Sequence, residues 1–291
     1  SYIQGNKEQL SAGITFSSKI PWLERETEVL SRLNRSLVDK IADAVRDCGK
    51  IMLEAVRTSD MVDAKEGHAN FVTTYDKKVQ ETLKEKLTEI LPAAAFVGEE
   101  DDIHASIQRG LAFIVDPIDG TTNLIHDMKL SAVALGYYEN GEITFGAVYN
   151  PFMDELFHAS LGGGAWLNGK RIAVSHRPLN NALIGFGTAP YYEELSRATM
   201  KIAYRLLHEA GDLRRSGSAA LDLAYVACGR MDAFFELRLK PWDIAAGALL
   251  VTEAGGVFTM PLNEKVDFDL STAVIASNAE CLEGLCRIVL E

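Results

Sequence analysis

The chain has 291 residues, of which 47 % are hydrophobic and 24 % are charged, and its formal net charge is −12. These values are typical of a globular protein with enough apolar material for one large domain or two tightly packed halves. The excess of acidic residues argues against a nucleic-acid-binding surface, which needs clustered basic residues. It still allows an anionic substrate if cations lie between the protein and the ligand.

The sequence has no apolar run long enough for a transmembrane helix and no signal-peptide pattern at its N-terminus. We therefore expect a cytoplasmic protein without a membrane partner. Its four cysteines, Cys48, Cys228, Cys281 and Cys286, include no CxxC pair. Buried free thiols are favoured over disulfides or a zinc site.

Two helices are expected in the first third of the chain. Residues 1–35 are polar and weakly patterned, so we interpret them as an extension. Apolar residues recur with helical spacing over 37–56, and a second amphipathic helix over 76–91 stops before a proline. A loop around 67–70 is expected to separate the two helices.

Strands follow the second helix. Apolar runs that end in acidic residues occupy 93–100 and 111–120. Two longer β-rich segments each contain an Asn-Gly pair, at 140–141 and 168–169, and each pair predicts a hairpin. The segment GAWLNGKR at 164–171 is one residue from a phosphate-binding P-loop, but the hairpin interpretation is favoured.

The second half of the chain alternates strands with helices. Strands are predicted at 182–189, 231–238 and 272–277, and helices at 191–211, 219–230, 241–256 and 278–291. The segment 212–218 is predicted to be a loop. We therefore expect an α/β fold with an extension at 1–35, an N-terminal α+β half at 36–180 and a C-terminal α/β half at 181–291, packed as a single catalytic unit.

The string FIVDPIDGTTN has the strongest chemical signal. A buried strand that ends at Val115 would deliver Asp116 to its end, and Asp119 follows three positions on. Gly120 permits a close approach of backbone to a ligand, and residues 121–123 begin a short helix whose N–H groups suit a phosphate. One side of this turn therefore favours cations and the other favours an anion.

Acids from distant segments are candidates for the same site. Glu99 and Glu100 follow an apolar run, and Asp243 lies in the first turn of a predicted helix. Carboxylates about 4 Å apart repel by about 4 kcal/mol at an effective dielectric constant near 20, and divalent cations remove that cost. Because the candidate ligands are oxygens, Mg²⁺ is favoured over Zn²⁺. Taken singly, Asp116 also fits a strand-end cap and Asp243 a helix N-terminal charge.

A resemblance to a known family rests on three motifs: GEED at 98–101, DPIDGTTN at 116–123 and WDIAAGALLVTEAGG at 242–256. By these motifs the chain resembles the inositol monophosphatase family, within the lithium-sensitive, magnesium-dependent phosphatase superfamily. The segments at 70–76 and 214–236 support it, and it extends from about Leu37 to the end of the chain. The resemblance implies a layered α-β-α-β-α sandwich of the inositol monophosphatase and fructose-1,6-bisphosphatase type, usually a homodimer.

The resemblance also implies a site with two to three Mg²⁺ ions. Glu99, Asp116 and the Ile118 carbonyl would bind the first ion. Asp116, Asp119 and Asp243 would bind the second, and Glu99 would also help to hold a weaker third.

Further roles are implied for residues around these ions. Gly120 and Thr121 would donate backbone N–H groups to phosphate, and the Thr121 hydroxyl, paired with Asp76, would act with Glu99 on the attacking water. The positions that match contacts to the sugar-like part of the substrate are Asp119, Gly217, Ser218, Ala219, Glu236 and Asp243. Lys65 and Asn70 would lie on a mobile loop that closes over the ions.

The chain departs from the family pattern at a few positions. Gln80 stands where a Glu is common, and His126-Asp127 replaces a common His-Gly, but neither change removes a ligand. A lone His126 is interpreted as a packing or capping residue. Arg214 and Arg215 remain open between gripping a second phosphate and making a salt bridge or interface contact.

The resemblance implies hydrolysis of a phosphomonoester by a metal-activated water, with inositol 1-phosphate as the first candidate substrate and no phosphoenzyme. The partner would be a small phosphorylated polyol or sugar. Alternative substrates are fructose 1,6-bisphosphate, histidinol phosphate and a 3′-phosphonucleotide. A non-enzymatic alternative is a regulatory protein that binds transcription machinery.

Overall fold

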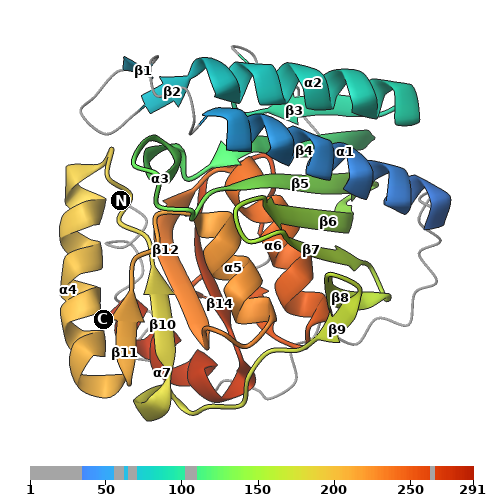
Figure 1. Cartoon of the computed structure of the whole chain (residues 1–291). Helices are drawn as coiled ribbons and strands as arrows, with labels where there is room; N and C mark the ends of the chain where they lie inside the picture. Colours follow the sequence, from blue (N-terminus) through green and yellow to red (C-terminus); the bar gives the residue numbers. More distant parts are fainter. Residues whose placement is uncertain (1–34, 56–61, 65–70, 102–109, 263–265) are drawn as a thin grey trace.

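The computed structural model describes residues 35–55, 62–64, 71–101, 110–262 and 266–291, so residues 1–34 of the expected extension lie outside it. The described residues form five layers: a helical pair, a seven-stranded sheet, a second helical pair, a five-stranded sheet and two outer helices (Figure 1). This arrangement confirms the expected α-β-α-β-α sandwich. None of the described helices is long and apolar enough to cross a membrane.

The seven-stranded sheet carries the first helical pair on one face. Its strands, in spatial order, are β3 (Ala95–Gly98), β4 (Leu111–Asp119), β5 (Ala132–Glu139), β6 (Glu142–Asn150), β7 (Glu155–Ser160), β8 (Gly164–Leu167) and β9 (Lys170–Ile172). β3 and β4 are parallel, and the other neighbouring pairs are antiparallel. The helices α1 (Arg35–Ala55) and α2 (Thr74–Ile90) pack on it through their apolar faces. A short ribbon of β1 (Val62–Ala64) and β2 (Phe71–Thr73) precedes α2.

Both predicted hairpins are present. Asn140 and Gly141 connect β5 to β6, and Asn168 and Gly169 connect β8 to β9. All four residues have positive φ, between 48° and 103°, which is the backbone form of a type I′ turn. The segment 164–171 is therefore a hairpin and not a P-loop.

The five-stranded sheet forms the second β layer. Its strands, in spatial order, are β11 (Asp212–Arg214), β10 (Leu183–Phe186), β12 (Ala233–Leu239), β14 (Thr272–Ser277) and β13 (Val257–Thr259). Two helices, α5 (Ala219–Ala227) and α6 (Pro241–Glu253), fill the layer between the sheets, and α4 (Glu193–Glu209) and α7 (Ala279–Leu290) cover the outer face. The prediction of a loop at 212–218 is wrong for residues 212–214, because they pair in parallel with β10. The division at residue 180 stays a prediction.

Two glycines allow α6 to approach the seven-stranded sheet closely. Gly136 of β5 and Gly146 of β6 are opposite each other in the sheet. A Cβ on Gly136 would lie 2.6 Å from the Cβ of Ala245, and a Cβ on Gly146 would lie 2.8 Å from the Ala246 carbonyl oxygen. Larger residues would push α6 outward. The two glycines therefore set the position of the N-terminus of α6, which carries Asp243.

The four cysteines are free thiols, as expected. Cys48, Cys281 and Cys286 are buried, whereas Cys228, just after α5, is only partly buried. Burial raises the pKa of each of the three buried thiols to about 12. These thiols therefore remain protonated packing residues.

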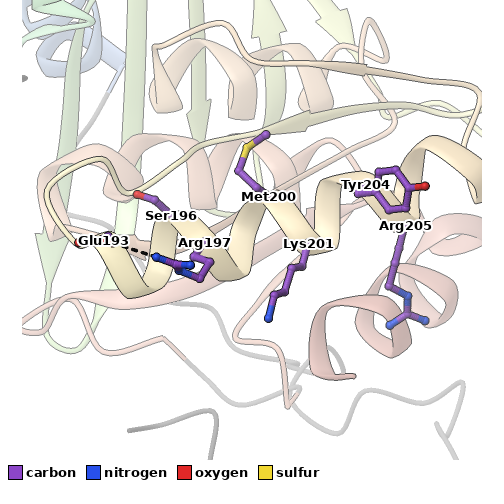
Figure 2. A pocket seen from close by; sticks show the side chains of 7 residues that line it. All are labelled: Glu193, Ser196, Arg197, Met200, Lys201, Tyr204 and Arg205. Atoms are coloured by element: carbon purple, nitrogen blue, oxygen red, sulfur yellow. Dashed lines mark hydrogen bonds and ion pairs between the residues drawn. The ribbon is translucent and has the colours of Figure 1, made fainter.

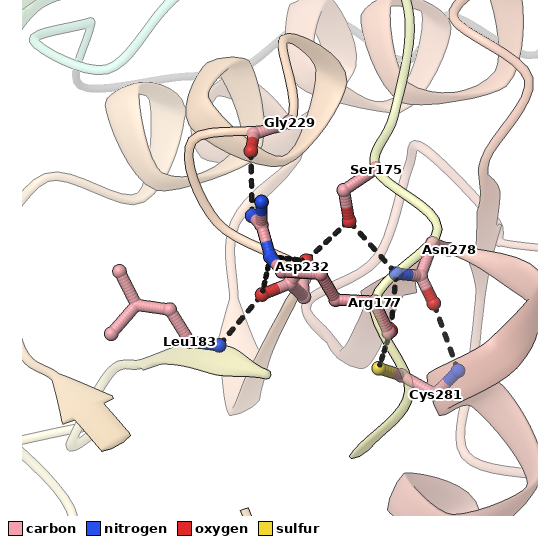
Figure 3. Close-up of polar contacts among 7 residues, drawn as sticks. All are labelled: Ser175, Arg177, Leu183, Gly229, Asp232, Asn278 and Cys281. Carbon is pink, nitrogen blue, oxygen red and sulfur yellow. Dashed lines mark hydrogen bonds and ion pairs between the residues drawn. The ribbon is translucent and has the colours of Figure 1, made fainter. Parts of the chain in front are cut away.

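A buried aspartate ties the segment after β9 to the five-stranded sheet (Figure 3). Asp232 is fully buried at the start of β12 and accepts hydrogen bonds from the Ser175 hydroxyl and, at 2.7 Å, from the Leu183 N–H. It also forms an ion pair with Arg177, 2.8 Å from Nε to Oδ1. Asn278 extends the network by donating to Ser175 and to the Arg177 carbonyl. These contacts fix the relative positions of β10, β12 and α7.

We expect Asp232→Ala to lower the free energy of unfolding by about 2–4 kcal/mol, because it leaves a buried N–H and hydroxyl without their acceptor. Chemical denaturation followed by circular dichroism measures the change. Asp212→Ala is the matched control, since Asp212 also contacts an arginine and a backbone N–H but is exposed. Equal losses for the two variants would show that the network does not stabilise the fold.

Candidate metal centre and phosphate-binding turn

The string FIVDPIDGTTN, residues 113–123, begins inside β4 and continues past its end. The strand does not end at Val115 as predicted but continues to Asp119, and its pairing with β5 shifts register between Asp116 and Asp119. Pro117 lies inside this irregularity, where its missing N–H costs no ladder hydrogen bond. The Ile118 N–H donates to Asp116 Oδ1 at 3.0 Å, which holds that carboxylate next to the bulge.

Gly120 connects the strand to the short helix α3 (Thr121–Ile125). Its φ of 83° is left-handed, and an added Cβ would lie 2.8 Å from the Leu130 carbonyl oxygen. The Ser131 hydroxyl donates to the Gly120 carbonyl at 2.8 Å, and the Asn123 side chain donates to Leu130 and to residue 216. The turn is therefore held from three sides, with the first N–H groups of α3 at its tip.

The expected contact between Thr121 and Asp76 is present. Asp76 lies in the first turn of α2 and is buried, and the distance from Thr121 Oγ1 to its Oδ1 is 3.0 Å. The same hydroxyl lies 3.0 Å from the Ile118 carbonyl oxygen. Thr121 is thus oriented by α2 and by the end of β4 together.

Four carboxylates from three segments line one cavity of about 680 Å³. Glu99 follows β3, Asp116 and Asp119 belong to β4, and Asp243 lies in the first turn of α6. Burial, followed by the negative charges of Glu99, Asp119 and Asp243, raises the pKa of Asp116 well above its ordinary value. Burial and then the charge of Glu99 do the same for Asp243. The structure therefore brings the four predicted acids to one cavity.

The four acids fit hard divalent cations by their chemistry, since they are oxygen donors that repel one another, Asp116 and Asp119 buried and Glu99 and Asp243 half-buried. They are not yet arranged around an ion: within the described ranges no three His, Cys, Asp or Glu side chains could already hold one. Asp119 Oδ2 accepts hydrogen bonds from the Ser218 hydroxyl and the Ala220 N–H, and Asp243 Oδ2 accepts one from the Lys240 N–H. Ion binding therefore requires these side chains to adjust.

Asp119 accepts hydrogen bonds from the start of α5. Burial raises its pKa to about 6, and the hydrogen bonds from Ser218 and from the backbone of α5 limit that rise. Ser218 is also the N-cap of α5, where its hydroxyl accepts from the Leu221 N–H. The start of α5 is therefore coupled to the carboxylate cluster.

The expected polyol-contacting residues line the same cavity: Gly217, Ser218, Ala219 and Glu236, together with Asp119 and Asp243. Glu236 is buried and accepts a hydrogen bond from the Ala189 N–H at 3.0 Å. Burial raises its pKa to about 7. Lys65 and Asn70, the expected mobile-loop residues, lie outside the described ranges.

The departures from the family pattern have structural roles. Gln80 accepts a hydrogen bond from the Glu100 N–H at 3.0 Å and donates one to Asp101 at 3.1 Å, so it holds the turn that carries Glu99. His126 is the C-cap of α3 and does not line the cavity, in agreement with the capping interpretation.

Several cavity residues were not predicted from the sequence. They are the side chains of Asp222, Arg238, Leu239, Lys240 and Trp242, and the segment 186–192 lines the cavity beside them. Asp222 lies in α5, is buried, and its Oδ1 has no hydrogen-bond partner among the described residues. No local pattern marks these residues, because they reach the cavity only through tertiary packing.

A second cavity, of about 690 Å³, lies on the outer face of α4 (Figure 2). Its lining contains one acidic side chain, Glu193, which pairs with Arg197 at 2.9 Å, and it exposes the apolar side chains of Met200 and Tyr204. It holds no set of carboxylates for an ion. Volume alone therefore does not identify the functional site.

Comparisons with known proteins agree with this geometry. Residues 34–291 match the inositol monophosphatase family. The chain is 38 % identical to Nus factor SuhB of Escherichia coli K12 (83 % of this chain, 91 % of that protein) and 34 % identical to inositol-1-monophosphatase of Bacillus subtilis 168 (84 % and 93 %). Among solved structures, the Thermotoga maritima IMPase superimposes with a TM-score of 0.79 at 32 % identity, over 87 % of this chain and 96 % of that one.

Proposed function

Because the chain belongs to the inositol monophosphatase family, whose members are typically Mg²⁺-dependent phosphatases, we propose that it hydrolyses a phosphomonoester with Mg²⁺. The observation that supports this most strongly is the cavity that joins four carboxylates, two of them buried and two half-buried, to the turn at Gly120 and Thr121. Cations beside backbone N–H groups form a pocket for a phosphate dianion. Inositol 1-phosphate is the first candidate substrate.

The proposed ligand sets are those that the family resemblance implies, and their side chains line one cavity. Glu99, Asp116 and the Ile118 carbonyl would hold one Mg²⁺, and Asp116, Asp119 and Asp243 a second, with Glu99 helping to hold a weaker third. Bound Mg²⁺ supplies positive charge that lowers the pKa of water and stabilises the departing alkoxide. Asp116 belongs to both sets, so its loss should affect both ions.

The other residues of the turn act on water and phosphate. The Thr121 hydroxyl donates to Asp76 or to the Ile118 carbonyl, and its oxygen can then accept a hydrogen bond from the attacking water. The N–H groups of Gly120 and Thr121 lie at the start of α3, where they can donate to phosphate oxygens. Direct attack by water needs no Cys or Ser nucleophile, so we expect no phosphoenzyme.

The far side of the cavity would receive the alcohol part of the substrate. Glu236 and Ser218 are hydrogen-bonding groups suited to hydroxyls of a polyol or sugar, and Gly217 and Ala219 leave room for its ring. We propose a cytoplasmic, homodimeric enzyme, as is usual in the family. Fructose 1,6-bisphosphate, histidinol phosphate and a 3′-phosphonucleotide remain alternative substrates for the same chemistry.

A second candidate function is binding to transcription machinery. The 38 % identity to a protein named Nus factor SuhB favours it. A protein that only binds a partner does not need Asp243 beside the other carboxylates. We therefore place catalysis first.

The test is release of phosphate from inositol 1-phosphate by the purified protein, with Mg²⁺ and with EDTA. We expect turnover that is lost in EDTA, is restored by Mg²⁺ in excess and is inhibited by millimolar Li⁺. Absence of metal-dependent turnover on every phosphomonoester of a panel would favour the binding function. A panel ranked by kcat/KM also identifies the preferred substrate.

A further inference from the structure

Three basic side chains line the same cavity as the carboxylates, in a chain whose net charge is −12. Arg215 lies in the loop between β11 and α5, Arg238 lies in β12, and Lys240 is the N-cap of α6. All three are exposed. None of them forms a salt bridge with a carboxylate in the part of the chain that the structure describes. Positive charge is thus available at the mouth of the cavity.

The contacts of Arg215 place it beside the expected polyol site. A Cβ on Gly217 would lie 3.2 Å from Arg215 Nη1, and Nη2 lies 3.5 Å from the Thr188 hydroxyl. Burial raises the pKa of both Asp222 and Glu236, and the positive charge of Arg215 limits that rise in each. Its guanidinium therefore faces the part of the cavity beyond the reacting phosphate.

Aromatic rings position the other two cations without neutralising them. The Arg238 guanidinium lies 4.2 Å from the centroid of the Tyr192 ring, and Lys240 Nζ lies 5.8 Å from that of Trp242. Contacts of this kind hold a cation in place and leave its N–H groups available to an anion. Arg238 and Lys240 are two positions apart, with Leu239 between them.

The adjacent arginine has a different environment. Arg214 does not line the cavity and pairs with Asp212 at 2.5 Å. The sequence left both arginines open between a contact to a second phosphate and a salt bridge or interface contact, and the two residues differ in this respect. Arg214 makes a surface salt bridge, and Arg215 faces the cavity.

We propose that Arg215, Arg238 and Lys240 form a subsite for a second anionic group of the substrate, remote from the phosphate that is hydrolysed. The inference rests on the proposed function and narrows its substrate class to phosphomonoesters with another phosphate or pyrophosphate. Arginine binds phosphate through paired, charge-assisted hydrogen bonds, which suits this role. A cavity of about 680 Å³ is large enough for a drug-sized ligand and hence for such a compound.

The test compares kcat/KM on three substrates for the wild type and for Arg215→Ala, Arg238→Ala and Lys240→Ala. The substrates are inositol 1-phosphate, fructose 1,6-bisphosphate and 3′-phosphoadenosine 5′-phosphate, which distinguish a sugar phosphate from a nucleotide phosphate as the second anion. Hydrogen bonds to charged groups are worth about 1.5–3 kcal/mol, so we expect each arginine variant to lose about 10- to 100-fold on at least one doubly phosphorylated substrate, mainly through KM. The loss on inositol 1-phosphate should be at least about tenfold smaller.

Arg214→Ala is the matched control, and it should leave the preference between substrates unchanged. Equal losses on all three substrates would show that the three basic side chains act only through the electrostatic field of the cavity, and would overturn the proposed subsite.

Calorimetric titration of fructose 1,6-bisphosphate and 3′-phosphoadenosine 5′-phosphate, with Ca²⁺ in place of Mg²⁺, provides a second measurement that does not require turnover. One outcome separates the two proposals: no substrate is hydrolysed, yet Arg215→Ala weakens this binding and Arg214→Ala does not. In that case the proposed function fails and the subsite stands. Binding that is unchanged in all three cavity variants overturns it.

Discussion

Asp116→Asn is expected to lower kcat/KM for phosphate release by more than about 100-fold, the loss typical of removing one electrostatic catalytic group. Asp116 lines the same cavity as Glu99, Asp119 and Asp243 and belongs to both proposed ligand sets. Asparagine keeps the size of the side chain but removes the charge that would hold the cations. Steady-state assays across a range of Mg²⁺ concentrations measure the loss, and a fully active variant would remove Asp116 from the ligand sets.

The same variant is expected to stabilise the metal-free protein. Burial and the neighbouring carboxylates raise the pKa of Asp116 in the folded state well above its ordinary value of 3.8. Below that value the carboxyl is protonated in both states. As the pH rises, the unfolded state loses the proton first, so this group increasingly destabilises the fold until the pH passes the raised pKa. Asparagine removes that penalty.

Thermal unfolding in EDTA between pH 5 and pH 8 tests the expected stabilisation. The variant should unfold at a higher temperature than the wild type, and the difference should grow with pH. Added Mg²⁺ should raise the wild-type unfolding temperature more than that of the variant. Asp43→Asn, at an exposed aspartate of α1, is the control for loss of one charge. A metal-free wild type that is more stable than Asp116→Asn at pH 8 would contradict the repulsion argument.

Gly120→Ala is expected to have the second large effect. The residue has a φ of 83°, and a Cβ there would lie 2.8 Å from a backbone oxygen that cannot move freely. A non-glycine residue in this left-handed backbone conformation costs about 1–3 kcal/mol, and the turn must shift to relieve the strain. Because the turn carries the N–H groups proposed to bind phosphate, we expect kcat/KM to fall by about 100-fold or more.

Gly141→Ala separates the strain from the effect on the site. Gly141 also has positive φ, in the β5–β6 hairpin, but an added Cβ meets nothing within 4 Å. This control should lose some stability and keep its activity. Similar activity losses for Gly120→Ala and Gly141→Ala would mean that reduced stability, and not the phosphate turn, explains the effect.

The sequence pointed to the acids of the candidate site because its strongest signals are local. Pro117, the acids on either side of it and Gly120 stand within one short string, and each Asn-Gly pair alone determines a hairpin turn. The predicted end of β4 at Val115 was wrong because strand pairing resumes after the bulge, and only the partner strand reveals this. Short edge strands such as β11 and β13 carry too few residues to show a periodic pattern.

The placement of the basic side chains at the cavity could not be predicted, for a different reason. Arg215 and Arg214 are identical residues in adjacent positions, yet one lines the cavity and the other pairs with Asp212. Arg238 and Lys240 reach the cavity because β12 and α6 meet there. Such placement depends on packing between segments distant in sequence. The proposed metal ligands could be named from residue chemistry and family resemblance, whereas the cluster of basic side chains required the fold.

We propose that carboxylates from distant segments bind hard cations beside a phosphate site lined by backbone N–H groups. A crystal grown with Mn²⁺ and phosphate tests it directly, because anomalous scattering locates each ion. We expect one Mn²⁺ between Glu99, Asp116 and the Ile118 carbonyl, a second between Asp116, Asp119 and Asp243, and phosphate against the N–H groups of residues 120 and 121. Mn²⁺ bound only elsewhere, with Asp119 and Asp243 still engaged by Ser218 and Lys240, would contradict the account.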